Sequence, residues 1–329
     1  MRAIGLMSGT SMDGIDIALM ETDGKNKIKP LGFLSSAYSG KQRGEIEHAC
    51  RLAREADMDK AQRLEESLTQ WHIEAVEDFL QKHKLSNTEI DVIGFHGVTI
   101  LHEPKYKRSW QLGNGEIMAQ ALGIDTVCNF RNADMQAGGQ GAPLAALFHE
   151  ALAYSENMAL PVLFVNIGGI SNVSYVSAEG VWAFDAGAGN ALLDEWAEKH
   201  LGTPLDKGGK LAAKGKPDEA LLSDWLAHPY FSTLPPKSLD RGELAQMVKG
   251  LETLSPEDGA ASLVAFTAEA IGQAAKSFSP YPLRAMVCGG GRHNKTLMKE
   301  LASRLGCEVF SSDIGDEMEA LCFAWLGVR

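Results

Sequence analysis

Long apolar runs are missing from this sequence of 329 residues. No stretch reaches the roughly eighteen consecutive apolar residues that a membrane-spanning helix requires, so we expect no membrane partner. The N-terminus, MRAIGLMSGTS, also lacks the apolar core and the cleavage site of a secretory signal peptide. These absences predict a cytoplasmic protein.

Cysteine is scarce as well. The five cysteines are scattered along the chain, and none shows the Cys-x-x-Cys or Cys/His spacing that is typical of a metal site. Reduced thiols in a cytosolic protein explain this pattern better than disulfides or zinc.

Positive charge is also in short supply. Lys and Arg number 31 against 43 for Asp and Glu, which gives a net charge of −12, and no block of basic residues occurs. Such a chain is a poor candidate for binding nucleic acid, so no nucleic-acid partner is expected. A phosphate-bearing small molecule must then be held locally, by backbone amides, helix ends and a metal ion.

What the sequence does contain is an alternation of strand and helix patterns, long enough for two domains. Strands are expected at 3–7, 15–19 and 31–37 and in the stretches IDVIGFHGVT, IDTVCNFR and PVLFVNI. Helices are expected at 43–84, 112–122, 145–154, 260–277 and in the closing DEMEALCFAWLGV. The stretch 203–242, rich in Pro, Lys and Gly, is expected to be an irregular insertion.

Two strand–turn–strand patterns, RAIGLMSGTSMDGIDIAL and PVLFVNIGGISNVSYV, each precede further helix and strand signals. An internal duplication explains this arrangement. Two unrelated β-hairpins explain it equally well from the sequence alone.

Four glycine-rich turns each follow an apolar strand: SGTSMDG, NIGGISN, DAGAGN and CGGGRHN. Glycine permits positive φ and close approach of the backbone, so such turns can present N–H groups to an anion. The first turn is not a P-loop, because no Gly-Lys-Ser/Thr follows its glycine. One such turn is weak evidence, but four at strand ends favour a ligand site, because ligands of α/β sheets gather there.

This combination resembles the actin-like/sugar-kinase/Hsp70 ATPase superfamily, in which a hairpin from each half grips the phosphates of ATP. More closely, the chain is similar to the anhydro-N-acetylmuramic acid kinase family, with motifs that follow the family's order over nearly the whole chain. They are MSGTSMDGIDIAL, FHGVTILHEP, GGQGAPL, NIGGISNVS, FDAGAGNALLDEW, PPKS, VCGGGRHN and DEMEALCFAWL.

The resemblance implies an α/β protein of two duplicated actin-like ATPase (ribonuclease H-like) domains that face a central cleft. The first domain would span 1–135, with the helix 316–329 packing back on it, and the second would span 136–315.

The resemblance also implies an ATP site and Mg²⁺. Asp13 would hold Mg²⁺ through water, since a carboxylate facing phosphate directly would be repelled. Asp16 is equally well explained as an outward-facing strand residue. The residues expected to bind ATP are Gly9, Thr10, Ser11, Met12, Asp13, Gly14, Ile15, Asp16, Gly168, Gly169, Asn172, Gly289, Gly290, Gly291 and Asn294.

Asp185 occupies the position of the family's general base in FDAGAGN. From the residues alone, an aspartate that precedes a glycine-rich turn is more often a helix cap or a turn residue. For the sugar, the resemblance points to Thr99, Arg131 and Glu319. A guanidinium at Arg131 suits the lactyl carboxylate of a muramic acid, although a surface salt bridge is as common a role.

The implied activity is ATP-dependent opening of 1,6-anhydro-N-acetylmuramic acid with phosphorylation of O6, in the recycling of cell-wall sugars. A related anhydrosugar or hexose kinase and a non-enzymatic ATP-dependent scaffold are the alternatives, and a homodimer is left open. Val98, Asn129, Ala186 and Ala188 depart from the residues usual in the family, which affects sugar contacts more than ATP use.

Overall fold

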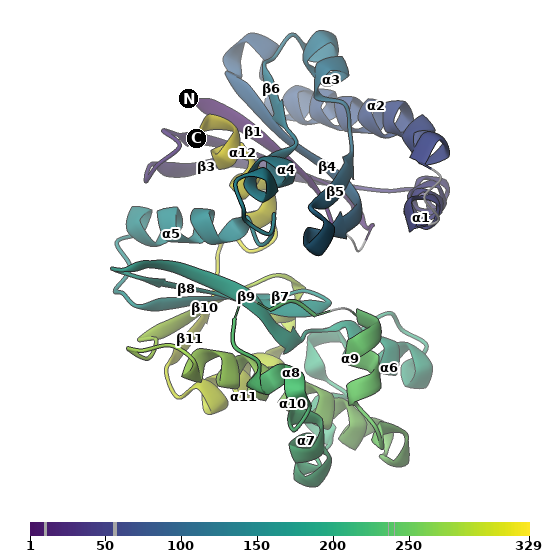
Figure 1. The fold of residues 1–329 in the computed structure, drawn as a ribbon, viewed down its shortest axis with the longest axis vertical. Helices are drawn as coiled ribbons and strands as arrows, with labels where there is room; N and C mark the ends of the chain where they lie inside the picture. The colour runs from purple at the N-terminus through teal and green to yellow at the C-terminus, as the bar shows by residue number, and fades with distance from the viewer. Residues whose placement is uncertain (10–11, 55–57, 236, 240) are drawn as a thin grey trace. The chain divides into compact units, whose positions relative to one another are not determined.

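The protein was analysed as a computed structural model that describes residues 1–9, 12–54, 58–235, 237–239 and 241–329 (Figure 1). The chain forms two compact units. Unit 1 comprises Met1–Glu156 and Glu317–Arg329, and unit 2 comprises Asn157–Asp316. The domain bounds expected at 135 and 316 stay a prediction, because compactness alone does not define the repeated halves.

Unit 1 contains a six-stranded sheet in the order β3-β2-β1-β4-β5, with β6 also paired to β4. β1, β2 and β3 form an antiparallel meander, and β4 and β6 continue the sheet parallel to β1. The strands are β1 (Arg2–Ser8), β2 (Gly14–Thr22), β3 (Ile28–Ala37), β4 (Val92–Glu103), β5 (Arg108–Leu112) and β6 (Thr126–Cys128). The α-helices are α1 (Gly40–Arg54), α2 (Met58–His83), α3 (Gly115–Leu122), α4 (Phe130–Gln136), α5 (Ala145–Ser155) and α12 (Met318–Val328).

Helix α12, from the far end of the sequence, packs on β1, β2 and β4 of unit 1. Two strand glycines make this packing possible. A Cβ on Gly5 would lie 1.8 Å from the Ala320 carbonyl oxygen, and one on Gly94 would lie 1.9 Å from that of Phe323. The helix backbone therefore rests directly on the strand backbones.

Unit 2 contains a five-stranded sheet in the order β11-β10-β7-β8-β9. Its strands are β7 (Val162–Ile167), β8 (Ile170–Ser177), β9 (Gly180–Ala188), β10 (Arg284–Cys288) and β11 (Glu308–Ser311). Its α-helices are α6 (Ala191–Leu201), α7 (Glu219–Leu226), α8 (Pro229–Ser232), α9 (Arg241–Met247), α10 (Pro256–Lys276) and α11 (Lys295–Leu305). The long α10 is buried along most of its length and packs on β8 and β9.

The two sheets share one topology. In unit 2, β7, β8 and β9 form the antiparallel meander, and β10 and β11 run parallel to β7, as β4 and β6 run parallel to β1 in unit 1. Two unrelated hairpins would not be followed by the same order and direction of further strands. The duplicated α/β fold expected from the sequence is thus present.

Two local expectations were wrong. The stretch IDTVCNFR is a strand only over Thr126–Cys128, because Asn129 takes a positive φ of 62° and α4 begins directly after it. The stretch 203–242 is not wholly irregular, because it contains α7 and α8. The Asp218 side chain caps α7 by accepting from two backbone N–H groups, and a proline opens α8.

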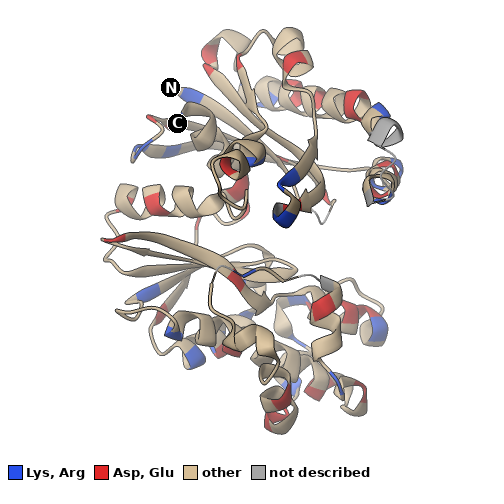
Figure 2. Cartoon of the chain, viewed as in Figure 1, with Lys and Arg blue, Asp and Glu red and all other residues tan. Residues whose placement is uncertain are grey.

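Among the described residues, no helix is long and apolar enough to cross a membrane. Acidic and basic side chains are interspersed over both units in the view of Figure 2. The expectation of no nucleic-acid partner stays a prediction.

Candidate active site

The turn between β1 and β2 is anchored by a buried hydrogen-bond network. Nδ1 of His72 lies 2.8 Å from the Leu68 carbonyl oxygen and so carries the proton. Nε2 of His72 then accepts from the Ser8 hydroxyl at 3.0 Å, and the Ser8 oxygen accepts from the Tyr38 hydroxyl at 2.9 Å. Burial lowers the pKa of His72 to about 4 and raises the pKa of Tyr38 to about 12. Both groups are neutral at physiological pH, so the network is uncharged.

The turn itself places Asp13 in solvent. The Met12 N–H donates to the Gly9 carbonyl at 3.0 Å, and the Asp13 side chain is 78% exposed, with Arg43 Nη2 at 3.7 Å from its Oδ1. Thr10 and Ser11 lie outside the described residues. A single exposed carboxylate fits Mg²⁺, which takes most of its ligands from phosphate and water. Among the described residues, no cluster of three or more acidic, His or Cys side chains forms a metal site.

The three residues after Asp13 that were also expected to bind ATP have different surroundings. The Ile15 side chain is buried in the core of unit 1. A Cβ on Gly14 would lie 2.3 Å from the Ser36 carbonyl oxygen, so strand packing alone requires that glycine. Asp16 is half-buried, and its charge raises the pKa of Tyr38 and of Glu319. Asp16 thus lies within electrostatic reach of Tyr38 and Glu319, and its expected contact with ATP stays a prediction.

A second group of polar residues in unit 1 gathers around Arg131. Its Nε donates to Nε2 of His96 at 3.0 Å, and its Nη1 donates to the Gly141 carbonyl at 2.7 Å. Nδ1 of His96 faces the Gly97 carbonyl oxygen at 2.9 Å, which fixes the proton on Nδ1 and leaves Nε2 to accept. Burial and the Arg131 charge lower the pKa of His96 to about 3. His96 therefore acts as a neutral acceptor that orients the guanidinium.

Glu319 completes this group from the first turn of α12. Glu319 as a whole residue is exposed to solvent, whereas the protein atoms around its carboxyl group desolvate that group. This desolvation and the charge of Asp16 raise the pKa of Glu319, while Arg131 opposes the rise. Thr99 lies on β4, where its hydroxyl accepts from Gln111 Nε2 at 3.2 Å. The structure thus brings Arg131, Glu319 and Asp16 within electrostatic reach and gives Thr99 a separate partner.

The stretch DAGAGN is not a turn over its whole length, because β9 continues through Ala188. Backbone hydrogen bonds join the residues that follow β9 to the turn at Gly168 and Gly169. The Gly168 carbonyl accepts from the Asn190 N–H at 2.7 Å, and the Gly169 carbonyl accepts from the N–H groups of Gly189 and Ala191 at 3.2 Å. The N–H groups of Asn190 and Ala191, at the start of α6, are therefore occupied. The N–H groups expected to face an anion are those of the turn at Gly168 and Gly169.

The glycines of these turns differ in whether a side chain would fit in their place. A Cβ on Gly289 would meet Asn166 Oδ1 at 2.4 Å, and one on Gly291 would meet an Ile167 methyl at 2.4 Å. By contrast, a Cβ on Gly168, Gly169 or Gly290 would find no protein atom closer than 3.6 Å. Protein packing therefore does not require these three glycines, and their expected role in binding ATP stays a prediction.

Asn190 lies next to both Gly168 and Gly290, and the sequence analysis did not identify it as a site residue. Its Nδ2 donates to the Ile167 carbonyl at 3.2 Å and is the neighbour that a Cβ on Gly290 would approach, at 4.0 Å. Asn294 has another role, because its buried side chain caps α11 by accepting from the Leu297 N–H at 3.0 Å. Its expected contact with adenosine stays a prediction.

Asp185 lies on β9, directly opposite Asn172 on β8. Burial raises the pKa of the Asp185 carboxyl, while the Leu239 N–H, which donates to Oδ2 at 3.0 Å, opposes the rise. Asp185 does not end the strand, because β9 continues to Ala188. A half-buried carboxylate with a raised pKa has the properties of a general base. It does not cap a helix, since the described N-cap of α6 is Asn190.

Residues 1–329 match the family described as "Anhydro-N-acetylmuramic acid kinase". A protein with that name from Methylobacterium nodulans is 44% identical over 350 residues, covering 100% of this chain and 93% of the relative. One with the same name from Zymomonas mobilis is 42% identical over 342 residues, covering 100% and 93%.

Two solved structures share the fold. Component A of (R)-2-hydroxyglutaryl-CoA dehydratase from Acidaminococcus fermentans superposes with a TM-score of 0.55 at 12% identity, covering 100% of this chain and 98% of that chain. The activator of 2-hydroxyisocaproyl-CoA dehydratase from Clostridium difficile, with bound ADPNP, gives 0.51 at 12% identity, covering 100% and 94%. With the duplicated sheets, this likeness confirms the expected pair of actin-like domains.

Proposed function

The chain belongs to the anhydro-N-acetylmuramic acid kinase family, and on that premise we propose that it opens 1,6-anhydro-N-acetylmuramic acid with water and phosphorylates O6 from ATP. The products are N-acetylmuramic acid 6-phosphate and ADP, as in the recycling of cell-wall sugars. The observation that carries the proposal is the half-buried, hydrogen-bonded Asp185 carboxylate, in the same unit as a turn whose glycines packing does not explain.

The role of Asp185 follows from proton balance. Asp185 takes a proton from the water that attacks C1, and the bond between C1 and O6 breaks. O6 then forms its bond to the γ-phosphorus as the bond to ADP breaks, so phosphate takes the place that a proton has in ordinary glycosidases. No second carboxylic acid is needed for the leaving oxygen.

The phosphates are assigned to the two glycine turns. N–H groups at Gly168 and Gly169 stabilise charge on the phosphoryl oxygens. Asp13 would hold Mg²⁺ through water, and this ion would supply positive charge against the phosphates. Thr10 and Ser11 are assigned to the same phosphates by resemblance to the family alone.

The sugar is assigned to the group around Arg131. Its guanidinium, oriented by His96 and the Gly141 carbonyl, pairs with the lactyl carboxylate. Glu319 and Thr99 supply oxygens for the sugar hydroxyls and the amide. A cytoplasmic location belongs to the same proposal, because both ATP and a recycled sugar are available there.

The test is a phosphorylation assay with 1,6-anhydro-N-acetylmuramic acid, ATP and Mg²⁺ in ¹⁸O-labelled water. Label at C1 of the phosphorylated product supports the proposal. An unlabelled product would identify a kinase that phosphorylates a sugar hydroxyl without ring opening.

The variant pair for this assay is Asp185→Asn and Asp224→Asn. Asp224 is an exposed aspartate on α7 of the same unit. We expect Asp185→Asn to lower kcat at least a thousandfold with ATP binding retained, and Asp224→Asn to match the wild type. Full activity of Asp185→Asn would remove Asp185 as the base.

A further inference from the structure

The general base is held by a segment far from it in sequence. This segment, residues His228–Pro235 and Lys237–Leu239, contains α8 and is called the strap here. β9 is an edge strand of its sheet, so one side of its backbone is left without a neighbouring strand in unit 2. The strap lies along that side at Asp185.

Three polar groups of Asp185 bond to the strap. Its backbone N–H donates to the Lys237 carbonyl at 3.3 Å, and its carbonyl accepts from the Tyr230 hydroxyl at 2.5 Å. Its Oδ2 accepts from the Leu239 N–H at 3.0 Å. The strap thus holds both the backbone and the carboxylate of one residue.

The strap is itself pinned. Lys237 Nζ donates to the Tyr230 carbonyl at 3.0 Å and lies 4.5 Å from the centroid of the Tyr230 ring and 5.6 Å from that of Phe184. The Leu239 side chain is buried in the core of unit 2. Phe231 packs edge-on against Phe266 of α10, with ring centroids 5.6 Å apart. Groups at both ends of the strap are therefore fixed to the body of the unit.

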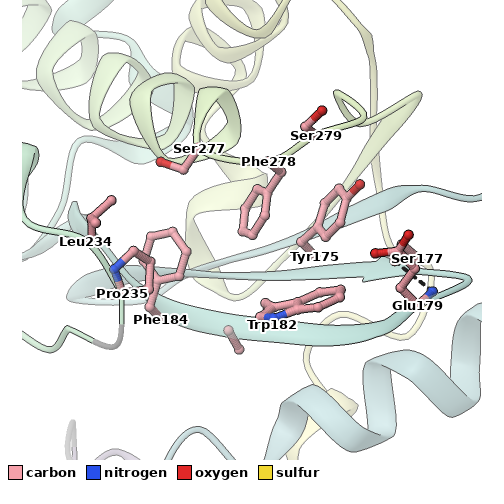
Figure 3. Close-up of a pocket in the computed structure, with 11 residues that line it drawn as sticks. Tyr175, Ser177, Glu179, Trp182, Phe184, Leu234, Pro235, Ser277, Phe278 and Ser279 are labelled. Carbon is pink, nitrogen blue, oxygen red and sulfur yellow. Dashed lines mark hydrogen bonds between the residues drawn. The ribbon is translucent and has the colours of Figure 1, made fainter.

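The other flank of the strap borders a pocket of about 530 Å³. Figure 3 shows Leu234 and Pro235 on one side of this pocket and the rings of Tyr175, Trp182 and Phe278 on the other. Leu234 is 81% exposed. Leu234 is thus far more exposed than Tyr230 and Leu239, the buried strap residues that bond to Asp185.

We propose that the strap is the positioning element of the general base. The Leu239 N–H engages Oδ2 and leaves Oδ1 to take the proton from water, while Tyr230 and Lys237 fix the backbone from which the carboxylate projects. The inference rests on the proposed role of Asp185 as base. Leu239, Tyr230 and Lys237 do not touch substrate in this scheme.

The charged and titratable groups around Asp185 are consistent with this role. Burial raises the pKa of Tyr230, and Asp185 and Glu243 of α9 raise it further, so Tyr230 stays a hydrogen-bond donor. Burial lowers the pKa of Lys237, whose ammonium faces the Tyr230 carbonyl rather than the carboxylate. The Leu239 N–H is then the group that favours the ionised form of Asp185 against desolvation.

The test compares Leu239→Pro, which lacks the N–H, with Leu239→Ala, which keeps it and loses a similar side-chain contact. A base must be deprotonated to act, so loss of the N–H raises the pKa of Asp185 and moves the acid limb of the kcat profile to higher pH. One hydrogen bond to a charged group predicts about a tenfold lower rate at acid pH for Leu239→Pro, relative to its own plateau. Leu239→Ala should keep the wild-type limb. Equal limbs in the two variants would overturn the proposal.

A readout without turnover separates this inference from the proposed function. In protein carrying ¹³C-carboxyl aspartate, Asp185→Asn assigns the Asp185 signal, and its titration is compared between the Leu239 variants. If the wild type is inactive on the anhydro sugar, the proposed function is refuted. If the Asp185 pKa is nevertheless higher in Leu239→Pro than in Leu239→Ala, the positioning role of the strap still holds. If Leu239→Pro does not fold, Tyr230→Phe serves instead. A kcat at least tenfold lower with unchanged KM for ATP upholds the strap, and an unchanged kcat overturns it.

Discussion

Substitution of Gly94 by alanine tests the packing that carries Glu319. The new Cβ would lie 1.9 Å from the Phe323 carbonyl oxygen of α12, whereas ordinary contacts begin near 3.4 Å. Strand or helix must therefore retreat by about 1.5 Å, and the obstacle is backbone rather than a flexible side chain. Overpacking in cores costs about 1–3 kcal/mol, and we expect a loss near the upper end, about 3 kcal/mol, for unit 1.

The assay is thermal unfolding of the full chain with Trp fluorescence as the probe. Trp325 on α12 is buried in unit 1, and its Nε1 donates to the Lys25 carbonyl at 2.8 Å. For a unit of this size, about 3 kcal/mol corresponds to a Tm lower by roughly 6–12 °C. The KM for the sugar should rise, because α12 carries Glu319.

The matched control is Gly44→Ala on α1, where a Cβ meets no atom within 4 Å. Alanine inside a helix is favoured over glycine by about 0.5–1 kcal/mol, so this variant should be slightly more stable than the wild type. If Gly94→Ala unfolds at the same temperature as the wild type, the direct packing of α12 on β4 is refuted.

Three further predictions concern unit 1. Burial lowers the pKa of His72 to about 4 and of His96 and His149 to about 3, so each stays neutral in the folded state while the unfolded chain binds a proton below about 6.5. The free energy of unfolding should therefore fall from pH 6.5 toward pH 4, by up to about 1.4 kcal/mol per pH unit for each histidine. Urea titrations that show no fall would contradict the conclusion that these histidines are neutral in the folded state. Arg131→Lys keeps the positive charge but loses the planar guanidinium that His96 and a backbone carbonyl orient. The KM for the sugar should therefore rise about tenfold or more, with the KM for ATP nearly unchanged. Equal KM values for the sugar in steady-state kinetics would exclude a role of Arg131 in binding the sugar. Tyr38→Phe removes the hydroxyl that donates to Ser8, at the end of β1, and should lower the free energy of unfolding in urea by about 1 kcal/mol. An unchanged free energy of unfolding would mean that this hydrogen bond does not stabilise the protein.

The sequence indicated the elements well where one pattern dominates. Alternating apolar residues placed the hairpin of β1 and β2, and glycine turns marked the strand ends. Strand order was not predictable from these local patterns, because pairing such as that of β1 with β4 joins segments far apart in the chain. The duplication became visible only through that order.

The site shows the same limit. Sequence reasoning treated the glycines of CGGGRHN alike, whereas neighbouring atoms require Gly289 and Gly291 and leave Gly290 open. The partners of Arg131 and Asp185 lie 35 and 54 residues away in sequence, with no periodic signal to join them. A donor such as the Leu239 N–H carries no side-chain signature at all.

The placement of α12 has a consequence for synthesis. Unit 2 is continuous in sequence, whereas unit 1 needs Met318–Val328, which the ribosome adds after all of unit 2. Domains fold largely as units while the chain emerges. The second unit can therefore mature first, although it is encoded second, and the first waits with the face of β1 and β4 uncovered. Since Glu319 arrives with α12, a nascent chain lacks one of the residues proposed to bind the sugar until α12 has been made.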